Sequence, residues 1–201
     1  YIYVGEWAGG RIEGTGKVTY PDGSVYEGTF RNDVADGTGK ITYPDGNTYD
    51  GEWSEGVIEG RGVATYANGL VYEGEFKDAK MNGIGKMTFA DGYTYEGSWK
   101  DGQRDGRGTA TYSDGTVYDG MFVDGQRQGQ GKIIMADGFT YEGEWNAGEI
   151  DGRGTATYAN GDVYEGMFER GKRQGEGTIR YASGEEQSGI WENGALTEPA
   201  D

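Results

Sequence analysis

The sequence contains no cysteine and no histidine, and only three of its 201 residues are proline. Without cysteine the chain forms no disulfide or thiolate metal site, and without histidine it lacks the commonest general base. No apolar run is long enough to span a bilayer. Basic residues are few, because 18 Lys and Arg stand against 35 Asp and Glu, for a net charge of −17. Such a surface repels phosphates and anionic headgroups, which argues against nucleic acid and membrane partners.

Glycine, in contrast, accounts for 41 residues, and 40 of these fall on five positions of a 23-residue period. If each repeat is numbered from its opening tyrosine, glycine recurs at positions 3, 8, 12, 14 and 21. The repeats begin at residues 3, 26, 49, 72, 95, 118, 141, 164 and 187, the last with Gln187 in place of tyrosine. A frame kept over the whole chain indicates a repeat fold rather than disorder. We expect a single repeat array over residues 1–194 and a polar C-terminal tail over residues 195–201.

Each half of a repeat alternates apolar and polar residues with period two, which predicts two strands. In the repeat that begins at Tyr49, the side chains of Tyr49, Gly51 and Trp53 share one face. The sequence predicts a loop over 54–59, and a tight hairpin turn at Asn68-Gly69 and at each equivalent pair. Short connections require antiparallel neighbours. We therefore predict an all-β fold, an elongated single-layer antiparallel meander of tandem β-hairpins that is twisted and curved with a groove.

The glycines at positions 3, 12 and 14 share a face with the aromatic residues, so we expect a trough in which Tyr and Trp rings lie flat. At position 5 Trp and Phe alternate between repeats, and a small residue at position 16 accompanies Trp whereas a larger one accompanies Phe. The true period is therefore a pair of repeats, 46 residues long. Such compensation of volume is typical of a close-packed core. We interpret the rings mainly as core, and we expect an alanine at Gly62 to collide with a ring.

Two segments carry the repeat motif most clearly, Tyr-Glu-Gly-Glu-Phe at 72–76 and Tyr-Glu-Gly-Glu-Trp at 141–145, each followed by a Gly-x-Gly pair. This motif resembles the MORN (membrane occupation and recognition nexus) repeat over essentially the whole chain. The resemblance implies a hairpin ribbon with a groove. It also implies a scaffold or targeting module that binds protein segments or forms homodimers. A lipid-binding or membrane-targeting role, often proposed for the family, is disfavoured by the net charge of −17.

We predict a non-catalytic scaffold that binds a protein or peptide, or another copy of itself, through an aromatic-lined groove, with no cofactor and no metal. The predicted groove consists of position-1 and position-5 rings: Tyr26, Phe30, Tyr49, Trp53, Tyr72, Phe76, Tyr95, Trp99, Tyr118, Phe122, Tyr141 and Trp145. Apolar residues predicted at the hairpin tips are further candidate contacts: Ile58, Met81 and Ile150. The alternative for these three residues is that they fold back onto the ribbon edge.

A carbohydrate-binding or cell-surface repeat is an alternative, because short repeats rich in Gly, Tyr and Trp also stack on sugars. Catalysis is not expected, since every carboxylate recurs in each repeat whereas an active site normally breaks a repeat. We interpret Arg104, Arg127 and Arg173 as solvated turn residues. The compartment stays open, with the cytoplasm favoured, and the start within a repeat indicates a fragment of a longer protein.

Overall fold

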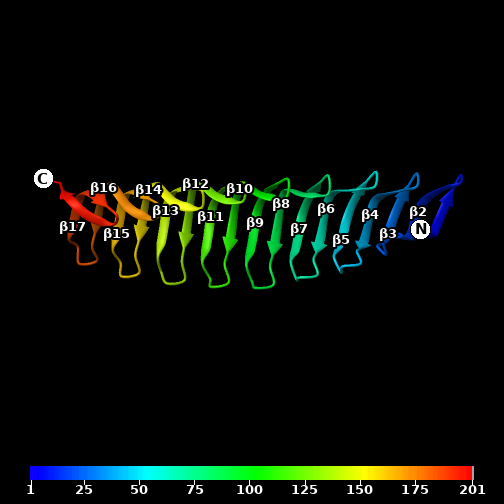
Figure 1. Ribbon diagram of the computed structural model, residues 1–201, viewed down its shortest axis with the longest axis horizontal. Coiled ribbons are helices and arrows are strands. Elements are labelled where there is room, and N and C mark those ends of the chain that lie inside the picture. The colour runs from blue at the N-terminus through cyan, green and yellow to red at the C-terminus, as the bar shows by residue number, and fades with distance from the viewer. Residues whose placement is uncertain (201) are drawn as a thin grey trace. The chain divides into compact units, whose positions relative to one another are not determined.

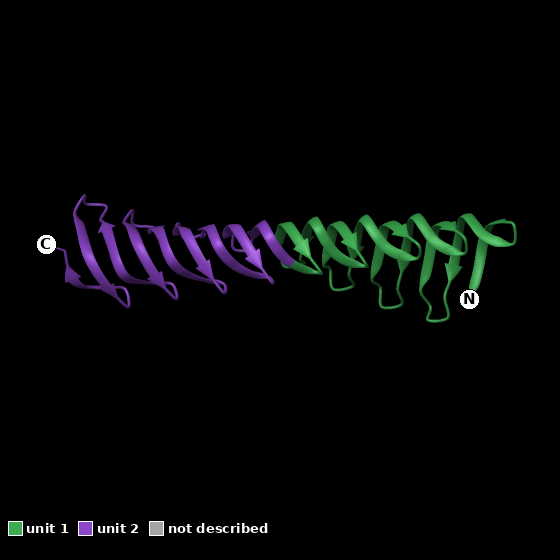
Figure 2. Cartoon of the chain, turned by 90° about the horizontal axis from the view of Figure 1, so that it is seen from above, with its two compact units in different colours: residues 1–103 green, residues 104–201 purple. Residues whose placement is uncertain are grey.

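The computed structural model describes residues 1–200, and strands are the only regular elements in that range (Figure 1). The chain divides into two compact units, Tyr1–Gln103 and Arg104–Asp201, which Figure 2 distinguishes by colour. The strands of unit 1 are β1 (Ile2–Ala8), β2 (Arg11–Thr19), β3 (Val25–Arg31), β4 (Val34–Thr42), β5 (Thr48–Ser54), β6 (Val57–Thr65), β7 (Val71–Lys77), β8 (Lys80–Thr88) and β9 (Thr94–Lys100). The remaining strands are β10 (Gln103–Thr111), β11 (Val117–Val123), β12 (Gln126–Ile134), β13 (Thr140–Asn146), β14 (Glu149–Thr157), β15 (Val163–Glu169), β16 (Lys172–Arg180), β17 (Glu186–Glu192) and β18 (Ala195–Pro199). The predicted all-β class is confirmed.

Within each unit every strand pairs in antiparallel fashion with the next strand along the chain. In unit 1 the register places the position-3 and position-14 glycines opposite one another on all nine strands, from Gly5 and Gly16 to Gly85 and Gly97. In unit 2 the same row runs from Gly108 to Gly189. A row of residues without side chains therefore crosses each unit perpendicular to its strands.

The opening tyrosine of each repeat lies across this glycine row. A Cβ built on Gly62 would stand 2.5 Å from three atoms of the Tyr49 side chain, and a Cβ on Gly51 would stand 2.5 Å from the Tyr49 hydroxyl. That hydroxyl donates a hydrogen bond to the carbonyl oxygen of Glu52 at 2.9 Å. The predicted trough is therefore confirmed for positions 3 and 14, because only glycine leaves space for the ring.

Edge-to-face contacts join most of the opening tyrosines to the aromatic residues of two repeats. Tyr49 contacts Trp53 of its own repeat and Phe76 of the next, with ring centroids 5.6 and 5.0 Å apart. The indole Nε1–H of Trp53 donates to the carbonyl of Gly39 in the preceding repeat at 2.9 Å. Trp99, Trp145 and Trp191 make the equivalent bond to Gly85, Gly131 and Gly177. Rings thus form one packed row within each unit, and they make up most of its buried apolar residues.

The hairpin turns differ from those predicted. Between β5 and β6 there is a two-residue turn, Glu55-Gly56, with φ of 49° and 85°, in place of the predicted loop over 54–59. Positive φ at both central residues is the turn geometry that continues the strand twist. The Asn68-Gly69 pair lies instead in a five-residue connection, closed by a bond from the Tyr66 amide to the Leu70 carbonyl. The Asp-Gly and Asn-Gly signals therefore mark the longer connection, and the glycine at position 8 marks the tight turn.

The glycine at position 12 has a role other than the one predicted. It does not lie under a ring, because the strand register shifts on the hairpin between the pair of Gly51 with Gly62 and the pair of Trp53 with Ile58, which is a β-bulge. Gly60 has φ of +89°, and a Cβ there would collide with the Glu52 side chain. The Glu52 carboxylate accepts a hydrogen bond from the Arg61 amide, a donor that the bulge leaves outside the ladder. Glycine is required at position 12 by backbone conformation rather than by ring packing.

The segment predicted as a polar tail contributes a strand. β18 pairs with β17 and brings Leu196 opposite Trp191, which repeats the hairpin construction of the earlier repeats. Asp201, the last residue of the predicted tail, lies outside the described residues. A single array over residues 1–194 stays a prediction.

We predict that the fold loses stability in alkaline solution. Burial raises the pKa of Tyr26, Tyr49, Tyr118 and Tyr141 to about 12, from an ordinary value of 10.0. Below pH 10 both folded and unfolded chains hold these protons, so the stabilisation is complete. Between pH 10 and 12 the unfolded chain loses them first, so the free energy of unfolding falls as the pH rises. Urea unfolding at stepped pH measures this, and a free energy of unfolding that stays constant up to pH 12 would contradict it.

Candidate functional site

The twelve rings predicted to line a groove are buried. None of them is more than 9 % exposed, and Tyr72, Tyr95, Tyr118 and Tyr141 are fully covered. Their faces are occupied by the glycine row on one side and by neighbouring rings on the other. A partner would have to displace this packing to reach them. The structure therefore places the predicted groove residues in the core, and contact between these rings and a partner stays a prediction.

The three predicted tip residues are half-buried rather than projecting. Ile58, Met81 and Ile150 stand opposite Trp53, Phe76 and Trp145 in the strand register. Each thus lies beside the position-5 ring of its own hairpin, as the alternative of folding back onto the ribbon predicts. Their contact with a partner is untested and stays a prediction.

The arginines at position 10 of their repeats were interpreted from the sequence as solvated turn residues. The structure shows that they stack on aromatic rings instead, so that interpretation was wrong. The Arg127 guanidinium lies 4.4 Å from the centroid of the Trp145 ring and donates to the carbonyl of Gly148 at 2.9 Å. Arg173 makes the same two contacts with Trp191 and Gly194. The tip of one hairpin is thereby fixed to the next. Their 46-residue spacing, with aromatic residues at position 5, was the sequence signal for this stacking.

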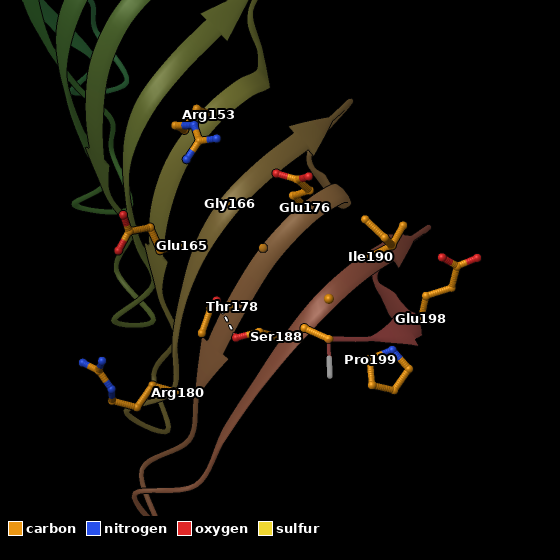
Figure 3. A pocket seen from close by; sticks show the side chains of 13 residues that line it. Arg153, Glu165, Gly166, Glu176, Thr178, Arg180, Ser188, Ile190, Glu198 and Pro199 are labelled. Atoms are coloured by element: carbon orange, nitrogen blue, oxygen red, sulfur yellow. Dashed lines mark hydrogen bonds between the residues drawn. The ribbon is translucent and has the colours of Figure 1, made fainter.

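An open groove lies on the face opposite the tyrosines. Its floor is the glycine row, and its walls are the side chains at positions 2, 4, 13 and 15; we call it the glycine groove. In unit 1 a hollow of about 600 Å³ is lined by Arg61, Val63, Ile84 and Lys86 together with Asp50, Glu73, Glu96 and four glycines. In unit 2 hollows of about 530 and 730 Å³ lie over the same row. Figure 3 shows the larger one, with Arg153, Glu165 and Arg180 around it and the bond between Thr178 and Ser188.

The walls of the glycine groove combine paired charges with exposed apolar side chains. Lys86 and Lys132 lie 3.9 and 3.3 Å from the carboxylates of Glu96 and Glu142 on the adjacent strands. Such exposed pairs contribute little to stability and exchange readily with other charges. Ile84 is 58 % exposed and lines the unit 1 hollow, where it is the most exposed of the large apolar side chains. Sequence reasoning missed this site because it assigned the groove to the aromatic face.

The charged and apolar side chains that line the glycine groove are suited to contact a bound partner. Among residues 1–200 no group of three Asp or Glu side chains is placed to hold a metal ion. In the same range no helix is long and apolar enough to cross a membrane.

The family model described as MORN repeat matches eight consecutive segments, at residues 3–25, 26–48, 49–71, 72–92, 95–117, 118–140, 141–163 and 164–186. No curated protein sequence matches the chain. Among solved structures, the TCP10 domain of Danio rerio CPAP in complex with a peptide of Danio rerio STIL is similar. Its TM-score is 0.55 at 15% identity, over 94% of this chain and 84% of that one. The CPAP G-box domain has a TM-score of 0.54 at 17% identity, over 88% and 93% of the two chains. At these identities the likeness is one of fold alone.

We predict that Arg127→Ala lowers the free energy of unfolding by about 1–2 kcal/mol, because it removes the stacking on Trp145 and the bond to Gly148. Arg153→Ala is the matched control, since Arg153 is an exposed arginine on the groove face of the same unit. Its cost is expected to stay within about 0.5 kcal/mol. Urea denaturation of both variants compares them, and equal costs would show that the arginine at position 10 does not join the hairpins.

Proposed function

This chain belongs to the MORN repeat family, and on that premise we propose that it is a non-catalytic protein-interaction module that holds an extended partner segment in the glycine groove. The observation that carries this proposal is the hollow over the glycine row, which recurs in both units. Binding of a peptide by a similar fold, that of the CPAP domain, supports it.

The floor of the glycine groove suits a main chain. Gly62 and Gly74 present bare backbone to the groove, since even a Cβ at these positions would point to the tyrosine face, and a partner main chain lies against this backbone between the flanking rows of side chains. The unit 1 hollow extends from Asp50 on β5 to Glu96 on β9. Four strand spacings of about 4.8 Å give a length of about 19 Å, which an extended segment of about six residues spans.

The side chains in the walls of the glycine groove supply an apolar anchor for the partner and the charges that select it. Ile84 is an exposed apolar side chain in a hollow that five charged side chains also line, and interfaces typically combine apolar anchors with such polar surroundings. Lys86 lies among Asp50, Glu73 and Glu96 on one side of the glycine row and Arg61 lies on the other, so the walls offer both charges to a partner. Sugar binding is less well supported, because the twelve rings at positions 1 and 5 that were predicted to line a groove are buried.

We predict that linear peptides selected from a random display library against the wild-type chain bind Ile84→Asp at least about tenfold more weakly. The substitution replaces this apolar lining side chain with a carboxylate. Val57→Asp is the control, because Val57 is an apolar residue of unit 1 that is 42 % exposed outside the groove. Titration calorimetry compares the three proteins, with circular dichroism to check folding. Unchanged affinity for Ile84→Asp would place the selected peptides elsewhere and refute the groove.

A further inference from the structure

A second row of rings in unit 1 is used neither by the core nor by the glycine groove. Position 18 carries Tyr20, Tyr43, Tyr66 and Phe89, each at the start of a five-residue connection; we call this row the tyrosine ladder. All four rings are partly exposed, and Tyr43 and Phe89 are 37 % exposed. The ladder therefore presents aromatic surface at the edge of the sheet where the longer connections lie.

The connections that carry the ladder are stacked on one another. A Cβ on Gly46 would lie 3.5 Å from Ala67, and a Cβ on Gly69 would lie 3.1 Å from Ala90 of the following connection. The side-chain oxygen of Asn47 accepts a hydrogen bond from the Ala67 amide at 2.9 Å. Because successive connections are in contact, the rings repeat at the spacing of two strands, roughly 9.6 Å.

Three of the four connections carry a carboxylate, whereas residues 66–70 carry Asn68 at the same position. Asp22, Asp45 and Asp91 each accept a hydrogen bond from the amide two residues on, which fixes the carboxylate in the turn. Bonds from the hydroxyl and amide of Ser24 lower the pKa of Asp22, so this group stays ionised. Burial raises the pKa of Tyr20 and of Tyr43, and the nearby Asp22 raises both further. Residues 20–24, 43–47, 66–70 and 89–93 contain no Lys or Arg. Three of the four rings of the ladder thus stand in connections that carry a carboxylate and no basic residue.

We propose that the tyrosine ladder binds a basic, proline-rich segment in the polyproline II conformation. A polyproline II helix has three residues per turn and rises about 3.1 Å per residue, so every third residue returns to the same face after about 9.3 Å. This matches the roughly 9.6 Å between rings. A β-strand does not fit, because its side chains alternate with period two and every third residue points away. Prolines pack between the rings, and Lys or Arg residues face the carboxylates.

Unit 2 supplies natural substitutions for the test. Its position 18 carries Tyr112, Met135, Tyr158 and Tyr181, so a methionine interrupts the row there. Methionine is therefore compatible with the fold at position 18. Asparagine is equally compatible at position 20, because Asn68 and Asn160 occupy it.

The test uses two fluorescent peptides of equal charge, four Pro-Pro-Lys triplets and four Gly-Ser-Lys triplets, titrated against the whole chain. We expect the proline peptide to bind at least about tenfold more tightly, because its conformation is already formed. The double variant Tyr43→Met/Tyr66→Met should remove that advantage, and Asp45→Asn should weaken both peptides. Tyr158→Met in unit 2 is the matched control and should change neither affinity. Equal binding of the two peptides, or unchanged binding by the double variant, would overturn the proposal. No groove residue is altered, so the result is independent of the glycine groove.

Discussion

The packing of one tyrosine ring across a pair of glycines determines the rest of this structure. In each repeat the ring occupies the volume that two Cβ atoms would fill on adjacent strands, as Tyr49 does above Gly51 and Gly62. The ring then meets the position-5 aromatic residue of its own repeat and of the next one. A single layer of strands thereby acquires a core without a second layer, and every repeat depends on its neighbour, as in other repeat folds.

This packing also decides where a partner is able to bind. Because the rings are enclosed, the aromatic face offers little free surface. A partner is therefore expected to bind at the surfaces that this packing leaves exposed. The glycine row, covered by rings on one face, forms the floor of a groove on the other. At the sheet edge the position-18 rings lie outside the core and repeat every two strands. Both proposed surfaces are therefore consequences of the same 23-residue period.

Much of the fold was predictable because the period fixes which residues share a face. The alternation around Tyr49 and the glycine frame predicted the strands, their antiparallel order and the burial of the rings. The position of the tight turn was not predictable from Asp-Gly and Asn-Gly signals, since residues such as Glu55 adopt positive φ without being Asn or Gly. The bulge that requires Gly60 and the open groove depend on contacts between strands, which local sequence patterns do not specify.

The most direct test of this packing is a double-mutant cycle between Gly62 and Tyr49, measured as free energies of unfolding in urea. All three atoms nearest to a Cβ at Gly62 belong to the Tyr49 side chain. We expect Gly62→Ala to cost about 3 kcal/mol in the wild-type chain and close to nothing in a Tyr49→Ala background, where the ring is absent. The same cost in both backgrounds would contradict the claim that the ring is what requires glycine.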